Sequence, residues 1–273
     1  MVKGPIGVFD SGYGGLTILR EITRSLPQYN YLYLGDNART PYGPRSFDTI
    51  YEYTSQCVRY LFEKGCHLII LACNTASAKA LRNIQQKFLP GNYPERRVLG
   101  VIRPTTEIIG TQSHSKKVGI LGTTGTIQSQ TYPIEIHRHF PEVEIFQQAC
   151  PMWVPLVEYG EYDNEGTEYF VRKNLEALYT QSEEIDTLIL ACTHYPLLIG
   201  KIKKFVPEGT TIIDQGKIVA SSLKDYLDRH PEMEEKCLKA GTIRFQTTDS
   251  TDLFNQQAGT FFGEKVTSEF VHL

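Results

Sequence analysis

The chain has 273 residues, of which 28 are basic and 31 acidic, for a formal net charge of −3, and 41% are hydrophobic. This composition excludes a disordered or collagen-like chain, and the length suffices for one large domain or two small ones with a real core. The near-neutral charge, without a cluster of Lys or Arg, argues against nucleic acid and anionic membrane surfaces as partners. It favours a small molecule.

The longest apolar run, at residues 67–73, is far shorter than the ~20 residues that a membrane-spanning helix needs. The N-terminal residues lead directly into a strand-like segment without the pattern of a secretion signal, so we expect a cytoplasmic protein. The six cysteines are scattered and include no Cys-x-x-Cys pair. That spacing argues against a disulfide framework and against a structural zinc site.

Short aliphatic or β-branched runs alternate with longer stretches of helical pattern, which is typical of βαβ units in a parallel sheet. We expect strands at residues 6–9, 31–34, 68–71, 98–102, 117–121, 143–147, 187–190, 211–213 and 242–246. Helices long enough for crossovers are expected at residues 16–25, 46–64 and 165–179. The predicted fold class is α/β, with doubly wound and mainly parallel sheets.

Two stretches of the first half of the chain have counterparts in the second half. Residues 6–12 are echoed by residues 118–124, and residues 68–75 by residues 187–194. The repeat predicts two pseudo-symmetric α/β domains. The first is discontinuous and comprises residues 1–101 and 214–273, and the second comprises residues 102–213. Because no flexible linker separates them, we expect the active site in a cleft between the domains.

Cys73 and Cys192 follow matched strands, at the carboxyl ends where open parallel sheets bind ligands. A helix N-terminus lowers the pKa of a thiol through its dipole and amide groups, so we expect thiolate to be available near neutral pH. One such cysteine alone is as readily a buried apolar residue. Two of them facing each other across a cleft can remove a proton from one face of a carbon and return one to the other. That chemistry is racemisation or epimerisation without a cofactor.

Other polar groups also follow strands. Asp10 can bind an ammonium group or help Cys73 to lose its proton, or it can cap the next helix. His194 is placed to exchange a proton with Cys192. The backbone amides of Tyr42 and Gly43 can hold a carboxylate, unless their loop is only a turn.

Neither a nucleotide nor a metal fits the pattern well. Thr17 stands where a dinucleotide-binding loop would need a third glycine, and no phosphate-loop lysine follows. Cys66 cannot share a metal ion with Cys73, because a strand of about 20 Å separates them at ~3.3 Å per residue. The two matched cysteines and His194 could trap zinc, but acid–base chemistry uses them better. We therefore expect no metal and no cofactor.

Several motifs together resemble those of the glutamate racemases in the aspartate/glutamate racemase superfamily. They are Asp10-Ser11-Gly12, Gly35-Asp36, Pro41-Tyr42-Gly43, Ala72-Cys73-Asn74-Thr75-Ala76 and Ala191-Cys192-Thr193-His194. The resemblance implies cofactor-independent racemisation of L-glutamate to D-glutamate for peptidoglycan synthesis, and so a role in cell-wall biogenesis and cell shape. It also implies a cytoplasmic enzyme that often forms a homodimer.

The same resemblance implies a role for each matched residue. Cys73 and Cys192 would be the two catalytic bases, Asp10 would assist Cys73, and His194 would assist Cys192. Glu158 would be a further catalytic acidic residue near the second cysteine. The implied substrate-binding residues are Asp10, Ser11, Tyr42, Gly43, Asn74, Thr75, Thr193 and His194, with Tyr42 and Gly43 at the side-chain carboxylate.

The chain departs from the family pattern at Tyr13, at Pro104-Thr105 and at Asp214-Gln215-Gly216. These departures bear on the shape of the cleft and on the inter-domain hinge. Three other functions stay open at this point. They are racemisation of aspartate or another amino acid, binding of an anionic amino acid without conversion, and thiol redox chemistry.

Overall fold

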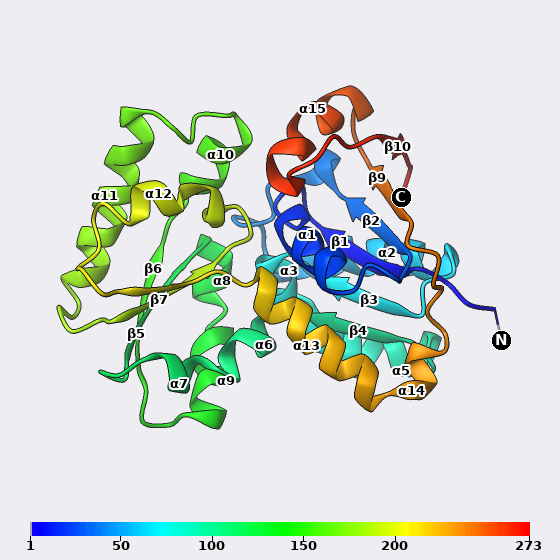
Figure 1. Cartoon of the computed structure of the whole chain (residues 1–273), viewed down its shortest axis with the longest axis horizontal. Coiled ribbons are helices and arrows are strands. Elements are labelled where there is room, and N and C mark those ends of the chain that lie inside the picture. Colours follow the sequence, from blue (N-terminus) through cyan, green and yellow to red (C-terminus); the bar gives the residue numbers. More distant parts are fainter. Residues whose placement is uncertain (1) are drawn as a thin grey trace.

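The computed structural model describes residues 2–273 and contains two parallel sheets, each in its own lobe (Figure 1). The six-stranded sheet has the order β10-β9-β2-β1-β3-β4, and the four-stranded sheet has the order β6-β5-β7-β8. The strands are β1 (Ile6–Asp10), β2 (Tyr31–Gly35), β3 (Leu68–Leu71), β4 (Arg97–Gly100), β5 (Lys117–Gly122), β6 (Glu144–Ala149), β7 (Thr187–Ala191), β8 (Thr211–Ile213), β9 (Ile243–Thr247) and β10 (Ser268–Phe270). Every neighbouring pair is parallel. The predicted α/β class is confirmed.

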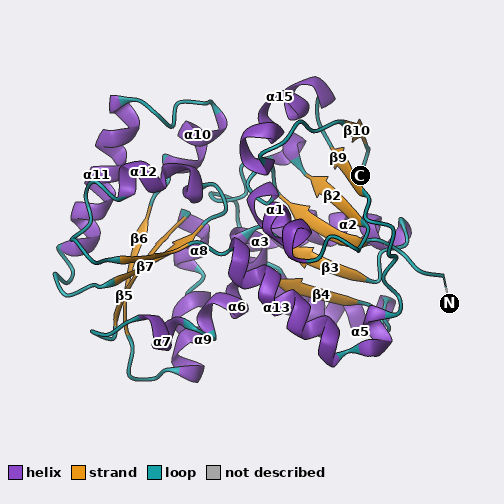
Figure 2. Ribbon diagram, in the orientation of Figure 1, coloured by secondary structure: helices purple, strands orange, loops and turns teal. Residues whose placement is uncertain are grey.

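Helices cover both faces of the six-stranded sheet (Figure 2). Successive side chains of a strand point to opposite faces, so Val8 packs with one group of helices and Phe9 with another. On the Val8 side lie α1 (Leu16–Ser25), α13 (Gly216–Arg229) and α15 (Thr251–Phe262). On the Phe9 side lie α2 (Phe47–Glu63), α3 (Asn74–Lys79) and a π-helical segment, Ile84–Phe88. The short helices α4 (Leu81–Asn83), α5 (Leu89–Asn92) and α14 (Pro231–Glu234) complete this lobe.

The four-stranded sheet is covered in the same way. Ile120 faces a core that includes residues of α6 (Ile102–Thr106), α7 (Ile109–Gln112) and α9 (Thr131–His139). Leu121 faces the opposite core, with residues of α10 (Trp153–Glu158), α11 (Glu165–Tyr179) and α12 (Ile199–Ile202). The helix α8 (Thr124–Gln128) follows β5. Both sheets are therefore doubly wound, and the apolar residues of their central strands are buried on both faces.

The chain passes between the lobes first from β4 to α6 and then from β8 to α13. After the second passage, β9 pairs with β2 and β10 pairs with β9, so the C-terminal segment extends the first sheet. The domain boundaries at 101/102 and 213/214 stay a prediction. Among the described residues, no helix is long and apolar enough to cross a membrane.

Two departures from the sequence prediction concern β4 and β10. The strand expected at residues 98–102 ends at Gly100, and α6 begins at Ile102. Pro104 fits the first turn of this helix because the amide groups there need no partner within the helix. The three-residue strand β10 was not expected, since its residues show no alternating apolar pattern. It is an edge strand that pairs only with β9 among residues 2–273.

Candidate active site

The strands that precede the two matched cysteines end on opposite walls of one cavity. β3 ends before Cys73 and β7 ends before Cys192, and both cysteines line a cavity of about 180 Å³ between the lobes. The other predicted residues that line it are Asp10, Ser11, Tyr42, Gly43, Asn74, Thr75, Thr193 and His194. Glu158 does not line the cavity, and its Oε1 contacts the ring of His194. The fold thus brings the predicted site residues together.

Cys73 caps the N-terminus of α3. Its Sγ accepts a hydrogen bond from the backbone N–H of Ala76 at 3.5 Å and lies 3.5 Å from Oγ of Ser11. Burial nevertheless raises the pKa of the Cys73 thiol to about 12, and the nearby Asp10 carboxylate acts in the same direction. The N–H of Ala76 at the helix N-terminus does lower this pKa, but the expectation that thiolate is available near neutral pH is wrong for the unliganded site. Loss of water destabilises the thiolate more than the two hydrogen bonds stabilise it.

Asp10 ends β1 and is 1% exposed. Its Oδ2 accepts the backbone N–H of Gly12 at 2.9 Å, whereas Oδ1 has no hydrogen-bond partner within residues 2–273. Burial raises the pKa of Asp10 more than the opposing influence of His194 and of backbone amides lowers it. The alternative role as a helix cap is wrong, because Gly15 is the N-cap of α1. A buried carboxylate oxygen without a partner is costly, so Oδ1 is available to a cation or to a thiol proton.

The second thiol belongs to a line of three side chains. Sγ of Cys192 lies 3.8 Å from Nδ1 of His194, and Nε2 of the same ring lies 3.0 Å from Oε1 of Glu158. Burial of the ring opposes its protonation, but the hydrogen bonds to Cys192 and Glu158 outweigh burial and raise the pKa of His194 well above its usual value. A turn and a 3₁₀ segment, Tyr195–Leu198, follow Cys192. The α-helix N-terminus expected at this thiol is therefore absent, and an imidazole takes its place.

The glycine-rich loop after β1 touches the second lobe. A Cβ atom on Gly14 would lie 2.4 Å from Oγ1 of Thr193 and 2.5 Å from Nδ1 of His194. In the same contact, Oγ1 of Thr17 donates to the backbone oxygen of Thr193 at 3.1 Å. Glycine at this position lets the loop approach the second thiol's neighbours without displacing them.

Threonine hydroxyls connect the lobes beside the first thiol. Oγ1 of Thr75 lies 3.0 Å from Oγ1 of Thr123 and 3.4 Å from Oγ1 of Thr126. Thr123 and Thr124 line the cavity, although the predicted set omits both. The internal repeat aligns Thr123 with Ser11, and that alignment is the sequence signal that identifies it.

In two predicted binding residues, the polar side-chain groups already form hydrogen bonds with other side chains of the protein. The hydroxyl of Tyr42 donates to the buried carboxylate of Asp36. The amide of Asn74 donates to Gln215 at 2.6 Å and accepts from the hydroxyl of Tyr132 at 2.7 Å. For both residues, the main chain is the principal polar group left to contact a substrate.

Metal binding finds no support in this geometry. Within residues 2–273, no group of three His, Cys, Asp or Glu side chains is arranged to hold a metal ion. The expectation that the reaction needs neither a metal nor a cofactor stays a prediction. The groups suited to proton transfer at the cavity are two thiols, one carboxylate and one imidazole.

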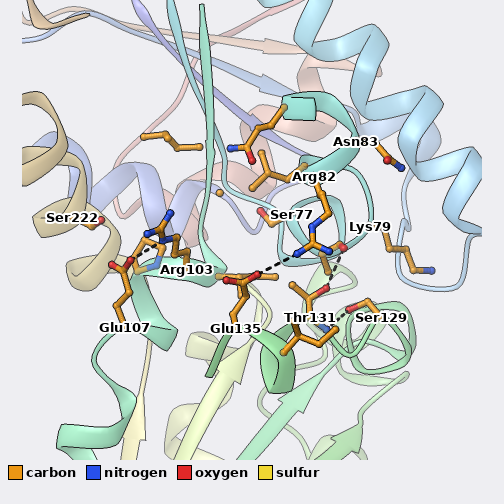
Figure 3. Close-up of a pocket in the computed structure, with 18 of the residues that line it drawn as sticks. Ser77, Lys79, Arg82, Asn83, Arg103, Glu107, Ser129, Thr131, Glu135 and Ser222 are labelled. Atoms are coloured by element: carbon orange, nitrogen blue, oxygen red, sulfur yellow. Dashed lines mark hydrogen bonds and ion pairs between the residues drawn. The ribbon is translucent and has the colours of Figure 1, made fainter. Parts of the chain in front are cut away.

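A larger cavity, of about 790 Å³, lies at the other end of α3 (Figure 3). Three of its arginines are paired with lining carboxylates: Arg82 lies 3.9 Å from Glu135, Arg138 lies 2.7 Å from the same carboxylate, and Arg103 lies 2.7 Å from Glu107. No cysteine and none of the predicted site residues line it. The predicted acid–base residues therefore belong to the smaller cavity.

Comparisons with known proteins agree along the whole chain. The sequence profile of the Asp/Glu/hydantoin racemase family matches residues 6–223. A glutamate racemase from Streptococcus gordonii is 39% identical over 276 aligned positions that cover 100% of both chains. Among solved structures, a glutamate racemase isoform from Bacillus anthracis has a TM-score of 0.89 at 34% identity, covering 99% of this chain and 98% of that one. One from Francisella tularensis in complex with D-glutamate has a TM-score of 0.86 at 31% identity, with the same coverage of 99% and 98%.

Proposed function

Because the chain belongs to the Asp/Glu/hydantoin racemase family and is an isomerase that acts on an amino acid, we propose that it interconverts L- and D-glutamate without a cofactor. The observation that carries this proposal is the single cavity that Cys73 and Cys192 line from opposite lobes. The choice of substrate is supported by the glutamate racemases to which the chain is similar, one of which binds D-glutamate.

In the proposed reaction, the thiolate of one cysteine removes the α-hydrogen as a proton, and the electron pair of the broken C–H bond passes into the α-carboxylate. The thiol of the other cysteine then donates its proton to the opposite face of the α-carbon, which forms the new C–H bond. The two sulfurs have exchanged protonation states at the end of the turnover. Proton exchange with water restores the starting state, and the reverse reaction uses the two groups in the opposite order.

The groups beside the thiols suit this reaction. The unpartnered Oδ1 of Asp10 can take the proton of Cys73 or bind the substrate ammonium, whose positive charge would offset the carboxylate that disfavours a thiolate. His194, held by Glu158, can deliver a proton to Cys192 or accept one from it. Both assignments are part of the proposal.

Hydroxyls and main-chain amides around the cavity suit a dicarboxylate substrate. Ser11, Thr75 and Thr193 offer hydroxyls, and the segment at Tyr42-Gly43 offers main-chain groups on the same cavity. Neutral donors of this kind can bind carboxylates without adding a positive charge next to the thiols. We assign Tyr42 and Gly43 to the side-chain carboxylate and the hydroxyls to the α-carboxylate.

We further propose that the D-glutamate serves peptidoglycan synthesis, that the enzyme works in the cytoplasm, and that it assembles as a homodimer. Sedimentation of the purified protein tests the assembly. Depletion of the protein in its host, with and without added D-glutamate, tests the cell-wall role. Rescue of growth by D-glutamate alone is the expected result.

The reaction itself is tested with reduced protein and L-glutamate in D₂O, with a chelator and no added cofactor. Loss of circular dichroism together with loss of the α-hydrogen signal by NMR is the expected result. A parallel sample with aspartate decides between the two substrates. Absence of exchange with both amino acids would refute the proposal and favour a binding protein.

The two-thiol mechanism is tested by Cys73→Ala and Cys192→Ala, each of which should slow racemisation by about 10²-fold or more. Cys66→Ala is the matched control, because Cys66 is also buried but does not line the cavity. Full racemisation by either single variant would show that the two-thiol mechanism is wrong.

A further inference from the structure

Gln215 lies at the second passage of the chain between the lobes. It is the residue before α13, and its side chain is buried, with 2% of the residue exposed. Val101 and Thr105 of the first passage hydrogen-bond to it. Gln215 therefore lies where both inter-lobe segments meet.

The carboxamide of Gln215 is bonded on both of its ends. Nε2 donates to the backbone oxygen of Val101 at 3.0 Å, to Oγ1 of Thr105 at 3.0 Å and to the hydroxyl of Tyr132 at 2.8 Å, with its two N–H groups shared among these acceptors. Oε1 accepts a hydrogen bond from Nδ2 of Asn74 at 2.6 Å. One side chain thus joins the first passage, α9 of the second lobe and α3 of the first lobe.

Three of these side chains form a closed ring of hydrogen bonds. Asn74 donates to Gln215, Gln215 donates to Tyr132, and Tyr132 donates to Oδ1 of Asn74 at 2.7 Å. Asn74 and Tyr132 are 2% and 1% exposed, so no member of the ring exchanges its partner readily for water. Each member of such a buried and satisfied network orients the other two.

Asn74 is the first residue of α3 and directly follows Cys73. The helix has six residues, so few of its own hydrogen bonds hold its first turn in place. Gln215 and Tyr132 do not line the small cavity, whereas Asn74 and Cys73 do. Asn74 is therefore the partner of Gln215 that lines the cavity.

We propose that Gln215 is a positioning residue of the racemase: its carboxamide holds Asn74, and with it the Cys73 thiol, in register with Cys192 on the opposite lobe. This inference rests on the proposed two-thiol reaction. Proton transfer needs near-ideal placement of donor and acceptor, and a displacement of about 1 Å can cost about 10²-fold in rate. The ring fixes the placement of α3 against the second lobe, which no contact within α3 alone can do.

The test uses Gln215→Met in the full-length protein, because Met has a similar length and lacks the amide groups. Gln246→Met is the matched control: Gln246 is 3% exposed, also hydrogen-bonds to a tyrosine hydroxyl, accepting from that of Tyr60 at 3.0 Å, and lies away from the cavity. Both variants lose a buried carboxamide. Only Gln215→Met should lower kcat, by about 10-fold to 10²-fold, with KM changed by less than the loss in kcat.

Isotope effects distinguish a general loosening of the fold from a displacement of the Cys73 thiol. With 2-deuterated L- and D-glutamate, the primary isotope effect of Gln215→Met should rise for the enantiomer that Cys73 deprotonates and not for the other. An equal change for both enantiomers, or an unchanged kcat in the folded variant, would overturn the inference. If Gln215→Met does not fold, Tyr132→Phe opens the same ring without changing the size of the side chain appreciably, and the same outcomes apply.

A second readout does not depend on the substrate. Iodoacetamide labelling followed by peptide mass spectrometry gives the alkylation rates of Cys73 and Cys192 separately. Gln215→Met should speed labelling of Cys73 relative to Cys192, and Gln246→Met should leave the ratio unchanged. An unchanged ratio in Gln215→Met would overturn the positioning role even if the wild type racemises glutamate. If Gln215→Met changes the ratio but the wild type is inactive on glutamate, the proposed function alone is refuted.

Discussion

Nε2 of His194 lies 3.0 Å from Oε1 of Glu158, and the opposite nitrogen of the ring faces the sulfur of Cys192. The charged neighbour of the other thiol, Cys73, is the carboxylate of Asp10, which raises the pKa of this thiol. The two sulfurs of the cavity therefore have unlike electrostatic surroundings. Such a difference suits a reaction that begins with one thiolate and one thiol.

Glu158→Gln should shift the pH dependence of the reaction. The charged carboxylate is one of the two groups that raise the pKa of His194, so its loss should lower that pKa. If protonated His194 supports the reaction at Cys192, the alkaline limb of kcat/KM should move to lower pH by about one unit or more. Profiles of kcat/KM against pH in both directions check this. A lower kcat with an unmoved alkaline limb would contradict the assigned role of Glu158.

Asp10→Asn should separate activity from stability. The amide keeps the shape of the side chain and can still accept the N–H of Gly12, but it can neither take a thiol proton nor balance an ammonium charge. We expect kcat to fall by about 10²-fold or more. Unchanged kcat in this variant would show that the carboxylate takes no part in proton transfer.

The same variant should change the pH dependence of stability with a definite sign. The pKa of Asp10 in the folded protein is raised above its ordinary value of 3.8, so the folded state holds this proton more tightly than the unfolded chain. The resulting stabilisation is full below pH 3.8 and is lost as the pH rises through the folded pKa. Relative to Asp10→Asn, the wild type should therefore lose stability across that window. Urea unfolding of both proteins from acidic to neutral pH measures the difference.

The unliganded protein should react slowly with alkylating reagents at Cys73. Only the thiolate reacts, and a pKa of about 12 leaves little of it at neutral pH. Asp10→Asn should speed the alkylation several-fold, because the charge of Asp10 raises the pKa of Cys73 and the variant removes that charge. Cys57 is the internal reference, since burial raises its pKa and Asp10 is not among the causes. Equal acceleration at Cys57 would mean that the variant has loosened the protein generally.

Much of the fold can be read from the sequence because its central strands are continuous apolar runs. Leu68–Leu71 and Thr211–Ile213 begin and end as predicted, and most other strands differ by one residue at an end. The edge strand β10 escapes prediction because parallel pairing to β9, and not an apolar face, holds it in place. Its partner is separated from it by α15, which a local pattern cannot reveal.

The site shows the same division between local and tertiary information. Cys73 and Cys192 can be predicted because residues that follow parallel strands gather at one edge of a sheet. The raised pKa of Cys73 cannot, because it depends on burial that other segments provide. The contacts of Gln215 are also tertiary: its partners come from three elements distant in the sequence. The sequence marked this residue only as a departure from a family pattern.

Gly14→Ala should damage the second thiol's surroundings more than the fold. The new Cβ would lie 2.4 Å from Oγ1 of Thr193 and 2.5 Å from Nδ1 of His194, so those side chains must move. Overpacking of this kind costs about 1–3 kcal/mol, and displacement of the imidazole should lower kcat by about 10²-fold. Gly200→Ala is the control, because a Cβ at this position in α12 meets nothing within 4 Å. Calorimetry and steady-state rates should show that Gly200→Ala is fully active and at least as stable as the wild type. A fully active Gly14→Ala would show that the close approach of the loop after β1 does not position His194.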